Sequence, residues 1–225
     1  DRSKDFTKNI SLLDLDERPQ QVEFAEKVEQ LLKEQKTAFI QAQTGLGKTY
    51  GYLLPALSME SEGGILVSVP TKILQNQIMQ EEGRRLKDTF HIDIHSLKGP
   101  QNYLKLDNFY KILHRPESNR LFTRFKMQVL IWLTETETGD LDEIGQLYRY
   151  QHFLAELVHD GKLSKKSLFI SEDFWQRSQD RAKSSHLLLT NHAYLVTRLE
   201  DAPEFVNNRL VIIDEAQKML IALEN

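Results

Sequence analysis

The chain has 225 residues, which is enough to bury a substantial core in one large domain or two small ones. Its composition, 40% hydrophobic and 28% charged, is ordinary for a globular protein. The absence of cysteine excludes disulfides, thiolate metal sites and a cysteine nucleophile. The net charge of −4 provides no overall basic field, so any nucleic-acid binding must depend on local groups.

The first residues of the chain carry no targeting signal. Residues 1–5 lack the apolar core of a signal peptide, and no apolar run in the sequence is long enough for a transmembrane helix. We therefore expect a cytoplasmic protein that does not use a membrane. Residues 1–16 are polar and are predicted to be a linker.

A first helix is predicted to begin just after Arg18. Pro19 suits a first helical turn, and apolar residues at helical spacing follow it. Gln21 could pair with the two edges of an adenine through its amide, although such a glutamine is more often simply solvated.

A glycine-rich loop between a predicted strand and a predicted helix is the most informative stretch. The apolar residues 38–40 are followed by Gln-Ala-Gln-Thr-Gly-Leu-Gly-Lys-Thr, residues 41–49. Such a loop points successive N–H groups at phosphate oxygens, and the start of the helix adds its positive dipole end. Lys48 would then reach the β- and γ-phosphates, and the Thr49 hydroxyl would ligate Mg²⁺. Ala42 stands where the strict pattern has glycine, so a chance glycine turn is the alternative for the loop considered alone.

Two further strands are predicted in the first half of the chain, at residues 65–69 and 91–97. Thr71 follows the first of them at the N-cap position of a helix. It either only caps this helix, or the helix N-terminus grips a nucleic-acid phosphate with Lys72 and Gln75 nearby.

Residues 105–185 differ from the flanking sequence, because their apolar residues recur at helical spacing in several segments and few stretches have the pattern of a strand. We expect a helical insertion in an α/β domain that is formed by residues 17–104 and 186–225. Just before the insertion, a Gly-Pro turn leads to Tyr103, which either stacks on a base or packs inside the protein.

Strand signals return near the end of the chain. His192 follows the tip of one strand and is either a polar residue at a helix cap or a group at the functional edge of the sheet. An apolar run over residues 210–213 ends in Asp214 and Glu215, as in a buried parallel strand with carboxylates at its ligand-binding tip. Asp214 would hold Mg²⁺ through water, and Glu215 would orient the attacking water.

Six motifs occur in a characteristic order: Arg-Pro-Gln-Gln (18–21), Ala-Gln-Thr-Gly-Leu-Gly-Lys-Thr (42–49), Val-Pro-Thr-Lys-Ile-Leu-Gln-Asn-Gln (69–77), Lys-Gly-Pro-Gln-Asn-Tyr-Leu (98–104), Leu-Thr-Asn-His-Ala-Tyr-Leu (189–195) and Asp-Glu-Ala-Gln (214–217). This set resembles the first motor domain of superfamily 2 DNA helicases of the DinG/XPD family. The resemblance runs from residue 17 to the C-terminus, and residues 98–104 and 190–195 are its most specific parts.

The resemblance implies a RecA-like parallel sheet flanked by helices, Mg²⁺-dependent ATP hydrolysis, and movement along single-stranded DNA in DNA repair or replication. Lys48, Asp214 and Glu215 would carry hydrolysis, with Thr49 and Asp214 at the Mg²⁺. The nucleotide would be bound by Arg18 and Gln21 at the adenine, by Thr44, Gly45, Leu46, Gly47, Lys48 and Thr49 at the phosphates, and by Gln217, which would link the site to a second motor domain. The residues near single-stranded DNA, or coupling it to ATP, would be Thr71, Lys72, Gln75, Asn102, Tyr103, Asn191 and His192.

One departure from the family concerns iron. Members with an iron–sulfur cluster have cysteine directly after Asn-Tyr-Leu, where this chain has Lys105, and a chain without cysteine cannot supply four thiolate ligands. We expect no iron–sulfur cluster. We predict that apolar packing replaces it in organising residues 105–185, through Phe109, Phe169, Phe174 and Trp175.

The resemblance also places the second motor domain, with its arginine finger, outside this chain, and cluster-free relatives often carry an exonuclease-like domain before the position of Asp1. Because an arginine finger contributes ~10³–10⁵ in rate, we expect the isolated fragment to bind nucleotide weakly and to hydrolyse it hardly at all. Two alternatives to a DNA motor remain. They are a degenerate helicase-like module that docks nucleic acid without turnover, and another P-loop enzyme such as a small-molecule kinase.

Overall fold

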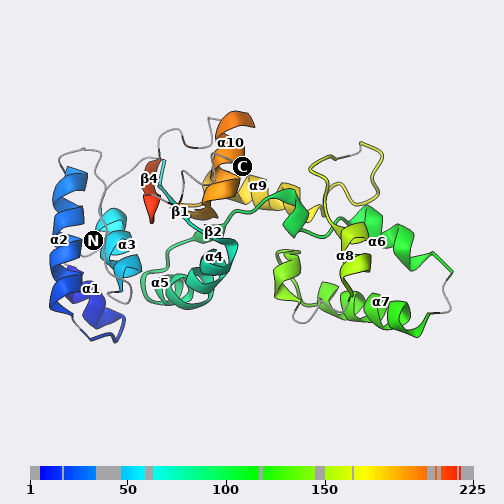
Figure 1. Ribbon diagram of the computed structural model, residues 1–225, viewed down its shortest axis with the longest axis horizontal. Coiled ribbons are helices and arrows are strands. Elements are labelled where there is room, and N and C mark those ends of the chain that lie inside the picture. The colour runs from blue at the N-terminus through cyan, green and yellow to red at the C-terminus, as the bar shows by residue number, and fades with distance from the viewer. Residues whose placement is uncertain are drawn as a thin grey trace. The chain divides into compact units, whose positions relative to one another are not determined.

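A computed structural model describes residues 6–16, 18–33, 47–58, 63–116, 119–144, 150–163, 165–201, 206, 209–216 and 218 (Figure 1). The chain forms two compact units: unit 1 contains residues 1–97 and 184–225, and unit 2 contains residues 98–183. The predicted strand at residues 38–40 lies outside the described residues. Within the described ranges, no helix combines the length and the apolar character that crossing a membrane requires.

Unit 1 is built on a parallel sheet of four strands in the order β2-β3-β1-β4. The strands are β1 (Ile65–Val69), β2 (Ile94–Ser96), β3 (Leu187–Asn191) and β4 (Leu210–Ile213). In the central strand β1, Ile65 lies opposite Leu187 on one side and Leu210 on the other. The predicted α/β fold with a RecA-like parallel sheet is therefore confirmed.

The strand β2 is shorter than the predicted range 91–97 for a local reason. The preceding helix ends at Phe90, and its C-cap is His91, whose backbone is left-handed with φ 53° and whose N–H donates to the carbonyl of Lys87. The chain therefore turns at His91 and becomes extended only afterwards.

The helices of unit 1 are α1 (Phe6–Leu12), α2 (Pro19–Lys33), α3 (Lys48–Ser58), α4 (Lys72–Ile78), the π-helix η1 (Met79–Gly83), α5 (Arg84–Phe90) and α10 (His192–Asp201). In Figure 1, α4 and α5 lie on one side of the strands and α10 on the other. This arrangement follows because the β1-to-β2 and β3-to-β4 connections run in opposite directions along the sheet, and crossovers between parallel strands are right-handed.

The prediction of a linker over residues 1–16 is wrong for residues 6–13. Phe6, Ile10 and Leu13 are buried in the same core cluster as residues of α2, α3 and the sheet. Because these residues are spaced by four and then three positions, they lie along one side of a short helix and form a single apolar stripe.

Unit 2 is helical, as predicted, with its own core around Leu104, Phe122, Phe125 and Val129. Its elements are the 3₁₀ turns η2 (Pro100–Asn102) and η3 (Leu141–Glu143) and the helices α6 (Leu106–Leu113), α7 (Arg120–Leu133), α8 (Gln151–Leu157) and α9 (Phe174–Ser184).

The boundary of unit 2 lies before the predicted residue 105. Residues 103 and 104 form antiparallel bridges with Asp140 and Val158, and this pairing makes the segment from residue 98 part of the helical unit.

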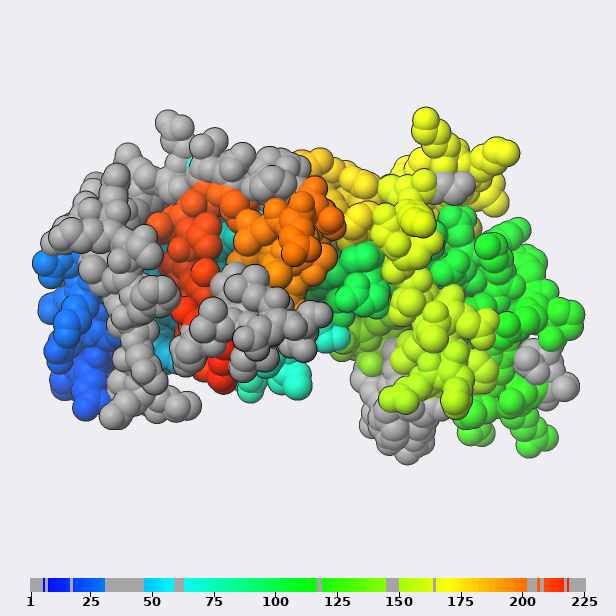
Figure 2. Space-filling model, turned by 45° about the horizontal axis from the view of Figure 1, so that its top comes forward, coloured from blue at the N-terminus to red at the C-terminus, as the bar shows by residue number. Residues whose placement is uncertain are grey.

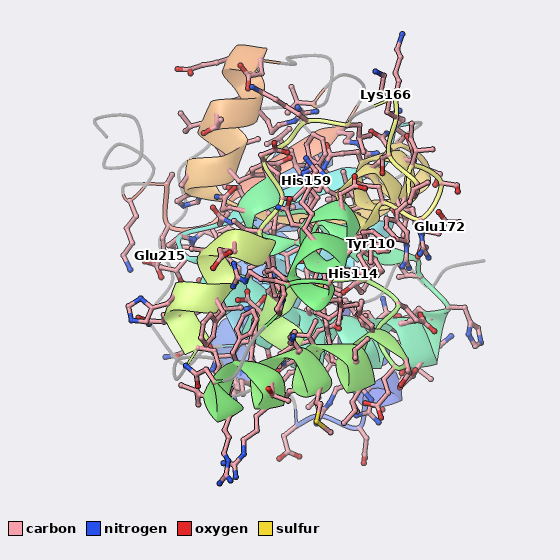
Figure 3. All side chains as sticks on the ribbon, turned by 90° about the vertical axis from the view of Figure 1, so that its right-hand side faces the viewer. Tyr110, His114, His159, Lys166, Glu172 and Glu215 are labelled. Carbon is pink, nitrogen blue, oxygen red and sulfur yellow. The ribbon has the colours of Figure 1, made fainter. Side chains whose placement is uncertain are left out.

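The aromatic residues expected to organise unit 2 occupy two environments. Phe109 and Phe174 are buried in its core, and Trp175 packs against that core. Phe169 is only half-buried. The centre of its ring lies 5.8 Å from that of Tyr110, and the Tyr110 and His114 ring centres are 4.2 Å apart (Figure 3). Apolar side chains therefore form the core of unit 2, and the ion pairs described below also connect its segments.

Candidate nucleotide site

The first residue of α3 meets the end of β4. The ammonium of Lys48 lies 3.4 Å from Asp214 Oδ1 and 3.4 Å from Glu215 Oε1. The Asp214 side chain is 8% exposed and the Lys48 side chain 21%, so the cluster is partly shielded from solvent. The structure thus brings together the three residues for which the sequence predicts hydrolysis, at the carboxyl edge of the sheet where open α/β folds bind ligands.

The Glu215 backbone is left-handed, with φ 49°. This conformation costs a non-glycine residue about 1–3 kcal/mol and persists only where the surroundings enforce it. The hydrogen bond from Lys218 and the charge of Lys48 lower the pKa of Glu215, against an opposing effect of burial. Glu215 is therefore ionised at neutral pH and can accept hydrogen bonds from water.

Gln21 lies against the last residues of the glycine loop. It is buried, and its Nε2 donates to the carbonyl of Gly47 at 2.7 Å. Gly47 has φ 64°, a left-handed conformation that favours glycine, and a Cβ there would displace the Gln21 amide from its hydrogen bond, since it would lie 2.2 Å from Nε2. Arg18 is exposed just before α2, and Thr49 is half-buried in α3.

The structure leaves part of the predicted site undescribed. Thr44, Gly45, Leu46 and Gln217 lie outside the described residues. Their predicted contacts with the nucleotide stay predictions.

Tyr52 lies one helical turn after Lys48, and sequence reasoning missed it because it resembles any apolar residue of the helix. Its hydroxyl is buried and makes no hydrogen bond of good geometry with the described residues, although the side chains of Thr49 and Asp214 both interact with it. Burial raises the pKa of Tyr52, and the charge of Asp214 raises it further. The hydroxyl therefore stays protonated, as a hydrogen-bond donor in the neighbourhood of the Asp214 carboxylate.

His192 is 1% exposed at the start of α10, which Figure 2 shows in orange next to the red surface of β4. Its Nε2 lies 2.9 Å from the carbonyl oxygen of Asp214, and its Nδ1 lies 2.7 Å from Ser68 Oγ. Because a carbonyl can only accept, Nε2 carries the proton and Nδ1 accepts from the Ser68 hydroxyl. Burial lowers the pKa of His192, which favours this neutral form. In this conformation the ring is inside the protein, and its predicted roles near DNA or in coupling stay predictions.

The predicted nucleic-acid residues of α4 separate into exposed and buried groups. Thr71 caps the helix by accepting from the Leu74 N–H at 3.2 Å, which confirms its predicted position, and Lys72 is exposed. Gln75 is fully buried, and its Oε1 accepts from Asn191 Nδ2 at 3.0 Å. Gln75 and Asn191 therefore bind each other, whereas Thr71 and Lys72 face solvent.

Asn102 and Tyr103 belong to unit 2, whereas the other predicted nucleic-acid residues belong to unit 1. The Asn102 amide donates to the carbonyl of Gly99 at 3.1 Å. Tyr103 is buried in the core of unit 2, with its hydroxyl 2.9 Å from Ser178 Oγ. Of the two alternatives for Tyr103, this placement favours packing over base stacking.

Unit 2 holds two buried polar clusters that sequence reasoning did not find. The ammonium of Lys98, whose side chain is 2% exposed, binds the carboxylates of Asp140 and Asp142. His159, labelled in Figure 3, lies with Nε2 2.9 Å from Asp173 Oδ2. Burial raises the pKa of Asp173, but its hydrogen bonds, above all the one from His159, outweigh burial and lower the pKa.

These two clusters join residues far apart in the chain, so no local spacing could reveal them. Lys98 and Asp140 are 42 residues apart, and His159 and Asp173 are 14 residues apart. No group of three His, Asp or Glu side chains suited to hold a metal ion occurs in the described parts of the chain.

The sequence pattern of the DEAD/DEAH box helicases matches residues 19–137, which is more than half of the chain. This range contains the glycine loop with Lys48 as well as β1 and α4. The chain therefore belongs to the DEAD/DEAH box helicase family.

Curated relatives give the subgroup. Proteins named 3'-5' exonuclease DinG are 32% identical over 215 residues in Staphylococcus saprophyticus and 34% identical over 193 residues in Bacillus subtilis. A third, from Staphylococcus epidermidis, is 29% identical over 221 residues. The alignments cover 92%, 80% and 96% of this chain but only 23%, 20% and 24% of the respective relatives. The chain is thus DinG-like, as predicted, and spans about a quarter or less of these relatives.

Proposed function

We propose that the chain is the ATP-binding first motor domain of an ATP-dependent DinG-like helicase that moves along single-stranded DNA. The observation that carries this proposal is the convergence of Lys48 with Asp214 and Glu215 at the carboxyl edge of the parallel sheet. By the resemblance of its motifs, the protein would act in the cytoplasm, in DNA repair or replication.

The geometry suggests how these groups respond to a nucleotide. Lys48 is paired with two carboxylates, and incoming phosphates would compete for its ammonium and leave Asp214 and Glu215 available. The Thr49 hydroxyl and the Asp214 carboxylate are oxygen donors of the kind that Mg²⁺ prefers, so these two residues fit the ion. Mg²⁺, when bound, would neutralise charge on the phosphates.

Glu215 is the group in this cluster suited to orient water. It is ionised, because the pKa of its carboxyl is lowered, and its second oxygen lies near Lys218. A charged carboxylate beside the phosphate site can accept a proton from the attacking water or align it. Nucleic acid would bind through exposed groups such as Thr71 and Lys72 at the start of α4.

A second candidate function is a helicase-like module that docks nucleic acid without turnover. The relatives supply the reason to consider it, because those much longer proteins are named for exonuclease activity and not for helicase activity. In that case Lys48 would stay paired with the two carboxylates, and the domain would serve to hold DNA.

The experiment is to measure ATP hydrolysis and ATP binding by the full-length protein, with and without single-stranded DNA. For a motor domain, DNA stimulates hydrolysis, and Lys48→Ala loses both nucleotide binding and turnover. Glu215→Gln keeps binding but loses about 10²-fold or more in turnover, as expected for a general base. Absence of hydrolysis under every condition, together with DNA binding that Lys48→Ala leaves unchanged, would establish the docking module instead.

A further inference from the structure

We propose that His192 is a positioning residue for hydrolysis, because it holds the Asp214–Glu215 turn in its left-handed conformation without touching the nucleotide. The effect on hydrolysis rests on the proposed function, whereas the contact between His192 and the turn is a feature of unit 1 itself.

The turn after β4 is held at consecutive backbone groups. The N–H of Asp214 donates to the carbonyl of Ser68 at 2.9 Å, and the carbonyl of Asp214 accepts from His192 Nε2 at 2.9 Å. The next residue, Glu215, is left-handed with φ 49°, a conformation that a glutamate does not keep unless neighbouring groups enforce it. Both backbone polar groups of Asp214 itself are thus fixed immediately before the strained residue.

Ser68 connects the two halves of this arrangement. It is fully buried in β1, its carbonyl accepts from Asp214, and its hydroxyl donates to His192 Nδ1 at 2.7 Å. One residue of the central strand therefore binds both the turn and the ring that holds the turn. Since the ring nitrogens have a donor on one side and an acceptor on the other, a single tautomer fits.

The position of His192 is itself fixed through its neighbour. Asn191 Oδ1 accepts from the Tyr194 N–H at the start of α10, and Asn191 Nδ2 donates to Gln75 at 3.0 Å. Gln75 is anchored in turn, because its Nε2 donates to the carbonyls of Leu97 and Leu189, each at 3.0 Å. The start of α10 is thereby tied to α4, to the middle of β3 and to the residue after β2, so the ring has little freedom to move.

The consequence concerns the direction of the Glu215 carboxylate. A change of Glu215 to a right-handed backbone would carry its side chain away from Lys48, which now lies 3.4 Å from it. By holding the backbone before Glu215, His192 therefore helps to keep this carboxylate directed toward Lys48.

The test uses the full-length protein with His192→Ala and His192→Gln, because a glutamine amide can still donate to the Asp214 carbonyl. Thr197→Ala is the matched control, since Thr197 is exposed on the same helix and its hydroxyl bonds only to Ala193 within that helix. Amide hydrogen exchange of the peptide over residues 210–218 measures the turn directly. Turnover and the affinity for fluorescent ADP are measured separately.

We expect His192→Ala to speed exchange in this peptide about tenfold and to lower kcat about tenfold or more, with ADP affinity changed less than about threefold. His192→Gln should recover most of both losses, and Thr197→Ala should change neither. If His192→Ala leaves the amide exchange of residues 210–218 unchanged, the inference is overturned. It is also overturned if His192→Ala lowers kcat and ADP affinity equally and speeds exchange throughout the sheet. If the unsubstituted protein hydrolyses no ATP, the proposed function fails, while the exchange measurement still decides the role of His192.

Discussion

Gly139→Ala is expected to destabilise unit 2 by about 2–5 kcal/mol. Gly139 has φ 68°, a conformation that costs an alanine about 1–2 kcal/mol. The added Cβ would also lie 2.1 Å from Cγ of Phe174, a buried ring that would have to shift. Overpacking of this kind costs about 1–3 kcal/mol, which gives the stated sum.

Gly161→Ala is the matched control for this prediction. Gly161 has φ 76°, but a Cβ there would meet Pro100 only at an ordinary 3.4 Å. It should therefore cost about 1–2 kcal/mol, the conformational part alone.

Urea unfolding followed by tryptophan fluorescence suits the comparison, because both tryptophans, Trp132 and Trp175, lie in unit 2. Equal losses in Gly139→Ala and Gly161→Ala would refute the reasoning that Phe174 leaves no room at the first position.

Further predictions concern single polar groups. Lys98→Met should cost about 1–3 kcal/mol in urea unfolding, because it strips two carboxylates of a buried partner, whereas Lys105→Met, whose ion-pair partner is exposed, should cost about 0–1 kcal/mol. Tyr52→Phe should lower the affinity for fluorescent ADP about threefold to tenfold in Mg²⁺ but not in EDTA, because it removes a buried hydroxyl that interacts with the Asp214 carboxylate; equal affinities of Tyr52→Phe and the unsubstituted protein in Mg²⁺ would contradict this. Because the folded pKa of Asp173 lies below its ordinary value of 3.8, its stabilising effect is present above that pH and lost as the pH falls through the folded value. Asp173→Asn should therefore be less stable than the unsubstituted protein at pH 6, with the difference shrinking only below about pH 4.

Local patterns made much of unit 1 predictable. The apolar run of β1 is continuous because this strand is buried on a parallel sheet, and Thr71 caps a helix through a side chain three residues from its donor. The prediction of a buried strand over residues 210–213 is wrong in its burial, because β4 alternates between half-buried and exposed residues. The helix over residues 6–12 was missed because its single apolar stripe is short and is surrounded by polar residues.

The interior polar contacts could not be predicted, since their partners are remote in the chain. The hydrogen bond between Ser68 and His192 joins residues 124 positions apart, and Gln75 and Asn191 are 116 positions apart. The sequence around Gln75, Asn191 and His192 is compatible with a helix cap or a solvated surface, and Ser68 is compatible with any strand position, because only the folded sheet brings their partners beside them. The same reason explains why the ion pairs of Lys98 were not foreseen.

Displacement of a labelled strand from a partly single-stranded DNA tests the central claim most directly. The full-length protein should release the strand when supplied with ATP and Mg²⁺. It should fail with a non-hydrolysable analogue, and Glu215→Gln should fail with ATP. If the protein binds the DNA and the strand stays annealed in the presence of ATP, the motor is contradicted and the docking module becomes the function of this domain.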